Sequence, residues 1–123
     1  MSKTTTHPPF SHPIEQEFAN ILDYYGIRWE YEPRTFALKW DENGNITEAF
    51  SPDFYLPDQD LYIELTTLRP KLITTKNRKI RRLKTLYPDI NIKLFKRRDL
   101  RDLMLKFGLD DHAANIMGTD AQD

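Results

Sequence analysis

The segment from Ser51 to Leu68, SPDFYLPDQDLYIELTTL, constrains the fold of this chain more than any other. Two short runs of aromatic and branched residues flank residues 57–60, Pro-Asp-Gln-Asp, a pattern that predicts two strands joined by a turn. If the turn is centred between the second and third of these four residues, Asp53 and Glu64 stand directly opposite each other. Their Cβ atoms would then be about 5 Å apart.

Two carboxylates in opposite positions of an apolar hairpin repel each other. If Asp53 and Glu64 face inward, they therefore need a neutralising partner. A divalent cation such as Mg²⁺ fits this need, because it takes one or two carboxylates together with phosphate oxygens. The alternative is that both acids face solvent on an amphipathic hairpin, and the hairpin alone does not decide between the two.

The length and the missing cysteines narrow the class of protein. The 123 residues suffice for one domain with a modest core. Without cysteine there is no disulfide framework, thiolate nucleophile or Cys-type zinc site. No apolar run approaches the ~20 residues of a membrane span, and the N-terminus lacks the apolar stretch of a signal peptide. We therefore expect a cytoplasmic protein that makes no membrane contact.

The charges are strongly segregated along the chain. The segment from Arg69 to Arg101 carries 13 of the 18 basic residues and only two acids, whereas residues 1–68 hold 12 acids and four bases. A basic face beside an acidic cluster is typical of a protein that attracts a polyanion with one part and holds a cation with another. The alternative is a helix whose solvent face happens to be rich in lysine and arginine.

The first periodic segment predicts a helix. Ser11 is a plausible N-cap, Pro13 fits the first turn, and Gly26 ends the helix. Glu15 and Glu17 flank the apolar stripe on opposite sides, so periodicity does not choose between them. The stripe itself follows helical spacing: Ile14, Phe18, Ile21, Leu22 and Tyr25.

Three strands are expected next, as an antiparallel meander. Residues 29–40 alternate between apolar and polar on either side of Pro33, which indicates a first strand bent at the proline. Asn-Gly within residues 41–45 predicts a hairpin turn. The second strand is expected from Ile46 to about Leu56, and the third from Leu61 to about Thr67.

Pro70 is expected to open a second helix that continues to Tyr87. Lys76 lies in the middle of its apolar stripe, and lysine is rarely buried without a partner. Its stem either extends to the surface or brings the amine to the two acids. If the helix folds back along the third strand, Lys76 lies ~9 Å along the helix axis, which matches about three strand residues and places it near Glu64.

The remaining chain is expected to add one strand and one helix. Residues 90–95 alternate as a fourth strand, parallel to the third because a helix connects the two. A final helix spans residues 99–107, with Leu100, Leu103, Met104 and Phe107 inward and Gly108 at its end. We expect one domain over residues 11–107, with disordered tails at 1–10 and 108–123. The three histidines share no ligand spacing and are expected on the surface: His7, His12 and His112.

This order of elements, together with two acidic motifs, resembles the PD-(D/E)XK nuclease superfamily. The motifs are the pair Pro52-Asp53 and, after ten intervening residues, Glu64 within an apolar strand. The resemblance covers about residues 12–96. It implies a restriction-endonuclease-like αβββαβα core of the α/β (α+β) class, with a mixed four-stranded sheet flanked by helices.

The resemblance also implies a metal site. In this family the corresponding acids bind Mg²⁺ (or Mn²⁺), so Asp53 and Glu64 are expected to do so with the carbonyl of Leu65. The family's first-helix glutamate resembles Glu15, which stands eleven residues before the helix-ending glycine, as in the Holliday-junction resolvases of this superfamily. The resemblance implies that Glu15 orients waters at the metal or helps to hold a second ion. Glu17 is the alternative.

The chain departs from the family pattern at the third motif position. Two residues after Glu64 the family usually has lysine, whereas this chain has Thr66. Some members move the basic residue to the following helix, which fits Lys76. Thr66 could hydrogen-bond a water on the metal but supplies no positive charge. If Lys76 does not replace the missing lysine, the protein would bind metal and DNA without cutting.

The sequence therefore predicts a metal-dependent endonuclease that hydrolyses phosphodiester bonds in DNA. Two alternatives stay open: a catalytically inactive DNA-binding module, and a regulatory or interaction module associated with a larger enzyme. Analogy with the fold adds the possibility of a homodimer. The basic residues expected to contact phosphates, largely without regard to sequence, are Arg69, Lys71, Arg78, Lys79, Arg81, Arg82, Lys84, Lys96, Arg97 and Arg98.

Overall fold

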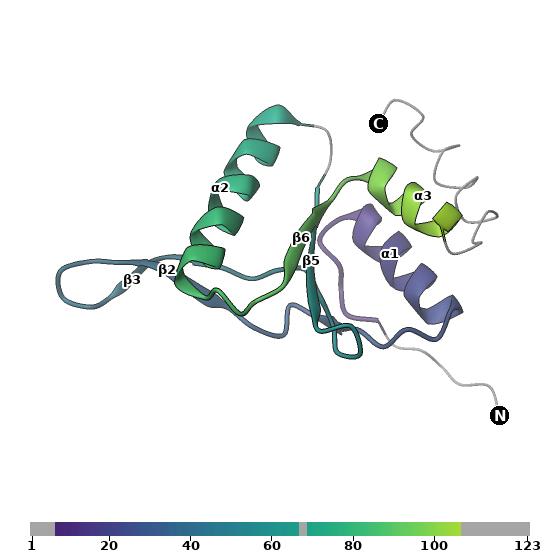
Figure 1. Ribbon diagram of the computed structural model, residues 1–123, viewed down its shortest axis with the longest axis horizontal. Helices are drawn as coiled ribbons and strands as arrows, with labels where there is room; N and C mark the ends of the chain where they lie inside the picture. Colours follow the sequence, from purple (N-terminus) through teal and green to yellow (C-terminus); the bar gives the residue numbers. More distant parts are fainter. Residues whose placement is uncertain (1–6, 67–68, 107–123) are drawn as a thin grey trace.

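A computed structural model of the chain describes residues 7–66 and 69–106. This part of the chain forms three helices and six strands, in the order α1 (Pro13–Tyr24), β1 (Glu30–Tyr31), β2 (Phe36–Trp40), β3 (Ile46–Phe50), β4 (Phe54–Leu56), β5 (Leu61–Leu65), α2 (Pro70–Leu86), β6 (Ile92–Phe95) and α3 (Arg97–Lys106). The fold is α+β. A mixed four-stranded sheet has the order β1-β4-β5-β6, and β2 and β3 form a separate two-stranded sheet (Figure 1).

The N-cap of helix α1 lies one residue later in the chain than expected. Pro13 occupies the first turn, where its missing N–H would have had no helical partner. The N-cap is His12 rather than Ser11, and it makes no side-chain capping bond. Instead, the backbone N–H of Ser11 donates to the carboxylate of Glu15 at 3.0 Å, which turns Glu15 back toward the start of the helix. The expected apolar stripe is buried except for Tyr25, which is 37% exposed.

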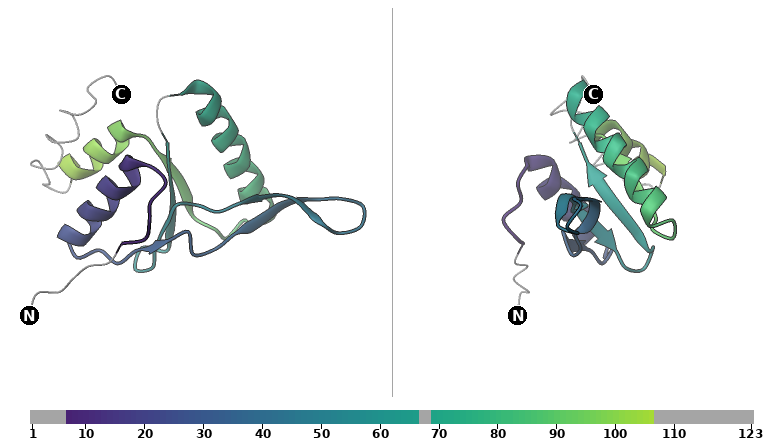
Figure 2. Two further views of the ribbon diagram at one scale, coloured as in Figure 1. Left: turned by 180° about the vertical axis from the view of Figure 1, so that it is seen from behind. Right: turned by 90° about the vertical axis from the view of Figure 1, so that its left-hand side faces the viewer.

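The expected first and second strands are each divided in two, so a continuous three-stranded meander is the wrong description. The first breaks at residues 32–35 and the second at residues 51–53, and each break contains a proline. Proline fixes φ and has no N–H for the strand ladder, so regular pairing stops there. The outer halves pair as the hairpin β2–β3, which projects beyond the larger sheet (Figures 1 and 2).

The inner halves build the sheet in the expected register. β1 and β5 both pair antiparallel with β4, and Phe54 lies opposite Ile63 and Leu56 opposite Leu61. This places the centre of the turn between Asp58 and Gln59, as the sequence predicts. β6 pairs with β5 in parallel, which confirms the fourth strand.

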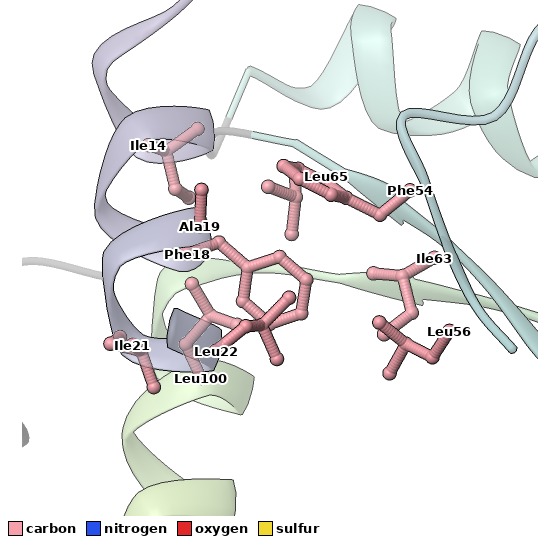
Figure 3. Packing of buried hydrophobic residues seen from close by; sticks show 10 residues of the cluster. All are labelled: Ile14, Phe18, Ala19, Ile21, Leu22, Phe54, Leu56, Ile63, Leu65 and Leu100. Carbon is pink, nitrogen blue, oxygen red and sulfur yellow. The ribbon is translucent and has the colours of Figure 1, made fainter. Parts of the chain in front are cut away.

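The two faces of the four-stranded sheet are covered by different elements. On one face α1 and α3 pack on β4 and β5 through a wholly apolar cluster of buried side chains (Figure 3), namely Ile14, Phe18, Ala19, Ile21, Leu22, Phe54, Leu56, Ile63, Leu65 and Leu100. On the other face, α2 and the start of the hairpin bury a second cluster: Phe36, Leu38, Phe50, Tyr62, Ile80, Leu83 and Ile92. Glu64 of β5 alternates with Ile63 and Leu65 of the first cluster and therefore faces this second side.

The N-terminal segment before α1 also packs against the domain, which corrects the expected boundary of disorder for residues 7–10. The Phe10 ring meets the Tyr31 ring edge-on, with centroids 4.8 Å apart, and His7 contacts Asp23 and Gln16. An aromatic side chain gains by leaving water, so this segment is held without regular structure. The expectations for residues 1–6, Phe107, Gly108, His112 and the C-terminal tail lie outside the described residues.

Across residues 7–66 and 69–106, we find no helix with the length and apolar character needed to cross a bilayer.

Candidate functional site

Asp53 and Glu64 lie side by side where β4 begins and β5 ends. Their sequence neighbours Phe54, Ile63 and Leu65 point into the α1 face, so the alternation of a strand turns the two acids to the α2 face. Both are buried, at 7% and 5% exposure. The predicted opposition of the two acids is confirmed, and their exposure on a solvated hairpin is excluded.

The backbone around the two acids holds their carboxylates in place. The N–H of Asp53 donates to Oε1 of Glu64 at 3.1 Å. The N–H of Leu65 donates to Oδ2 of Asp53 at 2.9 Å. Each acid therefore accepts a hydrogen bond from the strand that carries the other acid, and the hairpin fixes both side chains together.

Lys76 reaches the acids from the second turn of α2. Its Nζ lies 3.1 Å from Oε2 of Glu64 and donates to the carbonyl oxygen of Leu65 at 2.6 Å. The side chain is 25% exposed. The inward orientation expected from helix geometry is confirmed, and the alternative, in which the stem carries the amine to the surface, is wrong.

The protonation of this cluster departs from that of free side chains. Burial, and then repulsion from Glu64, raises the pKa of Asp53 to about 8. Burial also raises the pKa of Glu64, although the positive charge of Lys76 acts in the opposite direction. One cation next to two buried carboxylates leaves the cluster short of positive charge. It therefore holds a proton at neutral pH or accepts a further cation.

Glu15, and not Glu17, lies near this cluster. It is 3% exposed, accepts a hydrogen bond from the Tyr31 hydroxyl at 2.7 Å, and its charge helps to raise the pKa of Asp53. Glu17 instead pairs with Arg97 at 2.7 Å, between α1 and α3. The choice that periodicity left open is therefore made by tertiary packing.

A hollow of about 480 Å³ opens beside the cluster, at the end of the sheet. It is lined by His12, Ile14, Glu15, Leu65, Thr66, Arg69, Leu72 and Lys76. Thr66 is buried, and its backbone N–H donates to the carbonyl of Phe95 at 2.9 Å, so it continues the pairing of β5 with β6. Acidic and basic side chains thus meet in one concave site, the usual form of a ligand site.

The donor set fits one hard cation better than two. Asp53, Glu64 and the Leu65 carbonyl provide the oxygen ligands that Mg²⁺ or Mn²⁺ takes together with waters and phosphate oxygens. Burial raises the pKa of both acids, so a bound cation would stabilise their charged forms. Within the described residues no three acidic, histidine or cysteine side chains form a group able to hold an ion, so Glu15 does not complete a three-acid cluster.

Several of the basic residues expected to contact phosphates already make hydrogen bonds or ion pairs within the domain. Arg78 makes two hydrogen bonds to Glu48, at 3.1 and 2.8 Å. Arg82 donates through Nε to the Leu38 carbonyl at 2.9 Å. Arg97 is 14% exposed. The expected residues that stand exposed are Arg69, Lys71, Arg81, Arg82, Lys84 and Arg98.

Sequence reasoning missed the partner of Glu15. Tyr31 was assigned only to an alternating strand, yet its hydroxyl anchors the carboxylate. The pairing of β1 with β4 brings Tyr31 beside Phe54, and this long-range pairing leaves no periodic signal in the sequence.

Comparisons with protein-family models, curated proteins and solved structures gave no match to this chain.

Proposed function

We propose that this protein is a metal-dependent endonuclease of the PD-(D/E)XK type, which hydrolyses phosphodiester bonds in DNA. The observation that carries the proposal is the buried pair Asp53 and Glu64 with the Lys76 amine 3.1 Å from Glu64. Two adjacent buried acids destabilise a small domain, so such a cluster is typical of a functional site.

The order of the elements is consistent with the proposal. A helix, antiparallel strands, a helix and a parallel strand follow in the order of that superfamily. The acidic pair occupies the end of the central hairpin, where the superfamily has its metal ligands. Because a fold alone does not determine a reaction, the chemistry of the three side chains is the main argument.

In this proposal Asp53, Glu64 and the Leu65 carbonyl would hold Mg²⁺ or Mn²⁺. The chemistry that such an ion would supply is a lowered pKa of a bound water and polarisation of a phosphoryl oxygen. Lys76 takes the part of the lysine that Thr66 replaces: its amine leaves the Leu65 carbonyl and stabilises negative charge on the phosphate. Glu15 orients water at the edge of the site, and Arg69 in the same hollow contacts a phosphate.

A plasmid-nicking assay tests the proposal. Supercoiled DNA is incubated with Mg²⁺ or Mn²⁺ and with wild type, Asp53→Asn, Lys76→Met or the control Glu42→Gln, which changes an exposed acid of the hairpin loop. We expect nicking by wild type and the control, and losses on the order of 10²–10³-fold or more in the two site variants. DNA binding by wild type without metal-dependent nicking would instead identify an inactive DNA-binding module.

A further inference from the structure

The projecting hairpin β2–β3 and helix α2 form a second concave surface, distinct from the acidic cluster. The hairpin leaves the four-stranded sheet and passes α2 before it projects (Figures 1 and 2). Between them is an open hollow of about 610 Å³, lined by Lys39, Trp40, Thr47, Arg78 and Arg82. The hollow therefore combines one indole ring with three cationic side chains. We call it the arm hollow.

Trp40 is unusually exposed for its type. It is 45% exposed, and its cross-strand partner Ile46 is 60% exposed. Tryptophan carries the largest apolar surface of any side chain and is normally well buried. A half-exposed indole at the rim of a polar hollow offers a flat face on which another ring can stack.

The cations of the arm hollow are positioned in advance. The Nε of Arg82 donates to the Leu38 carbonyl, so its guanidinium is held against the hairpin. Arg78 is held by its paired hydrogen bonds to Glu48. Fixing a guanidinium before binding lowers the entropic cost of a later contact.

The net charge of the arm hollow is positive. Glu48 is the acid that neutralises part of it, 2.8 Å from Arg78 and 3.9 Å from Lys39. In the part of the chain that the structure describes, no carboxylate pairs with Arg82. At least one cation is therefore left for a polyanion.

We propose that the arm hollow binds an unpaired stretch of a nucleic-acid strand, with a base stacked on Trp40 and phosphates against Arg82 and Lys39. Aromatic rings beside cationic side chains recognise single strands in this way, because every base has a stacking face. The inference rests on the proposed function for the choice of nucleic acid as the polyanion. It requires neither the acids nor a metal ion. β3 ends three residues before Asp53, so the hairpin that forms the arm hollow is joined directly to the segment that carries this acid.

The test measures binding of a fluorescein-labelled 20-nucleotide oligothymidine by anisotropy, in EDTA and at low salt, with the full-length protein. We expect Trp40→Ala to weaken binding about tenfold, whereas Trp40→Phe restores most of the affinity. Ile46→Ala is the matched control, because it removes an exposed apolar side chain from the same hairpin, outside the hollow. It should bind like wild type.

Salt dependence separates stacking from charge. Arg82→Gln should reduce the slope of log affinity against log salt by about 0.7, the value for one phosphate contact on a single strand, whereas Trp40→Ala should leave the slope unchanged. Equal binding by wild type, Trp40→Ala and Arg82→Gln would overturn the inference. So would light scattering that shows Trp40→Ala dissociating an oligomer, because Trp40 would then cover a protein surface.

The two proposals fail in different ways. Binding that depends on Trp40, in a protein that nicks no plasmid with either metal, would support the arm hollow and reject the nuclease. If the protein nicks plasmid with metal but binds oligothymidine equally well with and without Trp40, the binding role of the arm hollow is rejected and the nuclease proposal is supported.

Discussion

The two faces of the four-stranded sheet both bury apolar side chains, but only one of them also carries a charged cluster. Toward α1 and α3, β4 and β5 present Phe54, Ile63 and Leu65, within a cluster that contains only apolar side chains. Toward α2, the alternate positions present Asp53 and Glu64 beside Lys76. The α1 face is wholly apolar, whereas the α2 face combines an apolar cluster with charged groups that burial disfavours.

This difference explains how a small domain can keep two buried acids. Burial of apolar surface contributes roughly 25 cal/mol per Å², and the α1 face concentrates this gain next to the acids. The backbone N–H groups of Asp53 and Leu65, which belong to the same strands, give each carboxylate a hydrogen bond. The apolar face and the acidic cluster therefore share the same strands, and removal of a buried charge should differ in sign from removal of a buried apolar side chain.

The largest effect on stability is expected from Phe54→Ala. Phe54 is fully buried, and its ring lies 5.1 Å from that of Phe18 and 5.4 Å from that of Trp29. Its removal leaves a cavity in the apolar face and should lower the free energy of unfolding by about 4 kcal/mol. Urea unfolding measures this as a lower midpoint at constant slope. Tyr55→Ala, on the other face of the same strand, is the control with a smaller loss, and an equal loss would break the contrast between the faces.

Lys76→Met should give the next largest effect, and its size should depend on pH. Without the amine, Glu64 is left buried with no cation, which costs about 3 kcal/mol at pH 8. At pH 5 the loss should be smaller, because burial already raises the pKa of Glu64 and a proton replaces the lost charge. Thermal unfolding at both pH values tests this. The double variant Glu64→Gln/Lys76→Met should recover most of the loss, and a strictly additive double variant would show that the two side chains do not interact.

Asp53→Asn should stabilise the metal-free protein. The pKa of Asp53 is raised from 3.8 to about 8, so between these values the native state binds more protons than the unfolded state. Stability contributed by this group therefore falls as pH rises from about 4 to 8. Asparagine keeps an oxygen for the Leu65 N–H and removes the charge. In EDTA above pH 8, we expect a gain of about 1–2 kcal/mol, and little change near pH 4. A loss at pH 8 would mean that the carboxylate is stabilising where it lies.

The acidic cluster was accessible from the sequence because its geometry is local. The turn at residues 57–60 fixes the register of the hairpin, and register sets which side chains are opposite and which face they share. Lys76 could be placed because the helix that follows β5 has a fixed rise per residue. Because α2 follows β5 directly in the chain, an error of one or two residues in either boundary changes the predicted position of Lys76 only slightly.

The features that the sequence did not reveal depend on distant pairings. Glu17 meets Arg97 across 80 residues, and Arg78 meets Glu48 across 30. The alternation of apolar residues on either side of Pro33 predicts one bent strand. Periodicity does not reveal that Pro33 and Pro52 each interrupt the strand pairing, so that both long strands divide in two. The projecting hairpin, and the exposure of Trp40, follow from that interruption and were missed with it.

The smallest effect should come from Tyr31→Phe, and it tests Glu15, the acid of α1 whose charge acts on Asp53. Burial and the hydrogen bond to Glu15 raise the pKa of Tyr31 to about 12, so its hydroxyl stays protonated and donates to Glu15 at 2.7 Å. Loss of this bond should lower the free energy of unfolding by about 1 kcal/mol, measured by urea unfolding.

If Glu15 serves the acidic cluster, Tyr31→Phe should also slow plasmid nicking, and Glu15→Gln should slow it further at similar stability. Unchanged nicking in both variants would assign Glu15 to the start of α1, where it also holds the Ser11 N–H, and would restrict the functional chemistry to the α2 face.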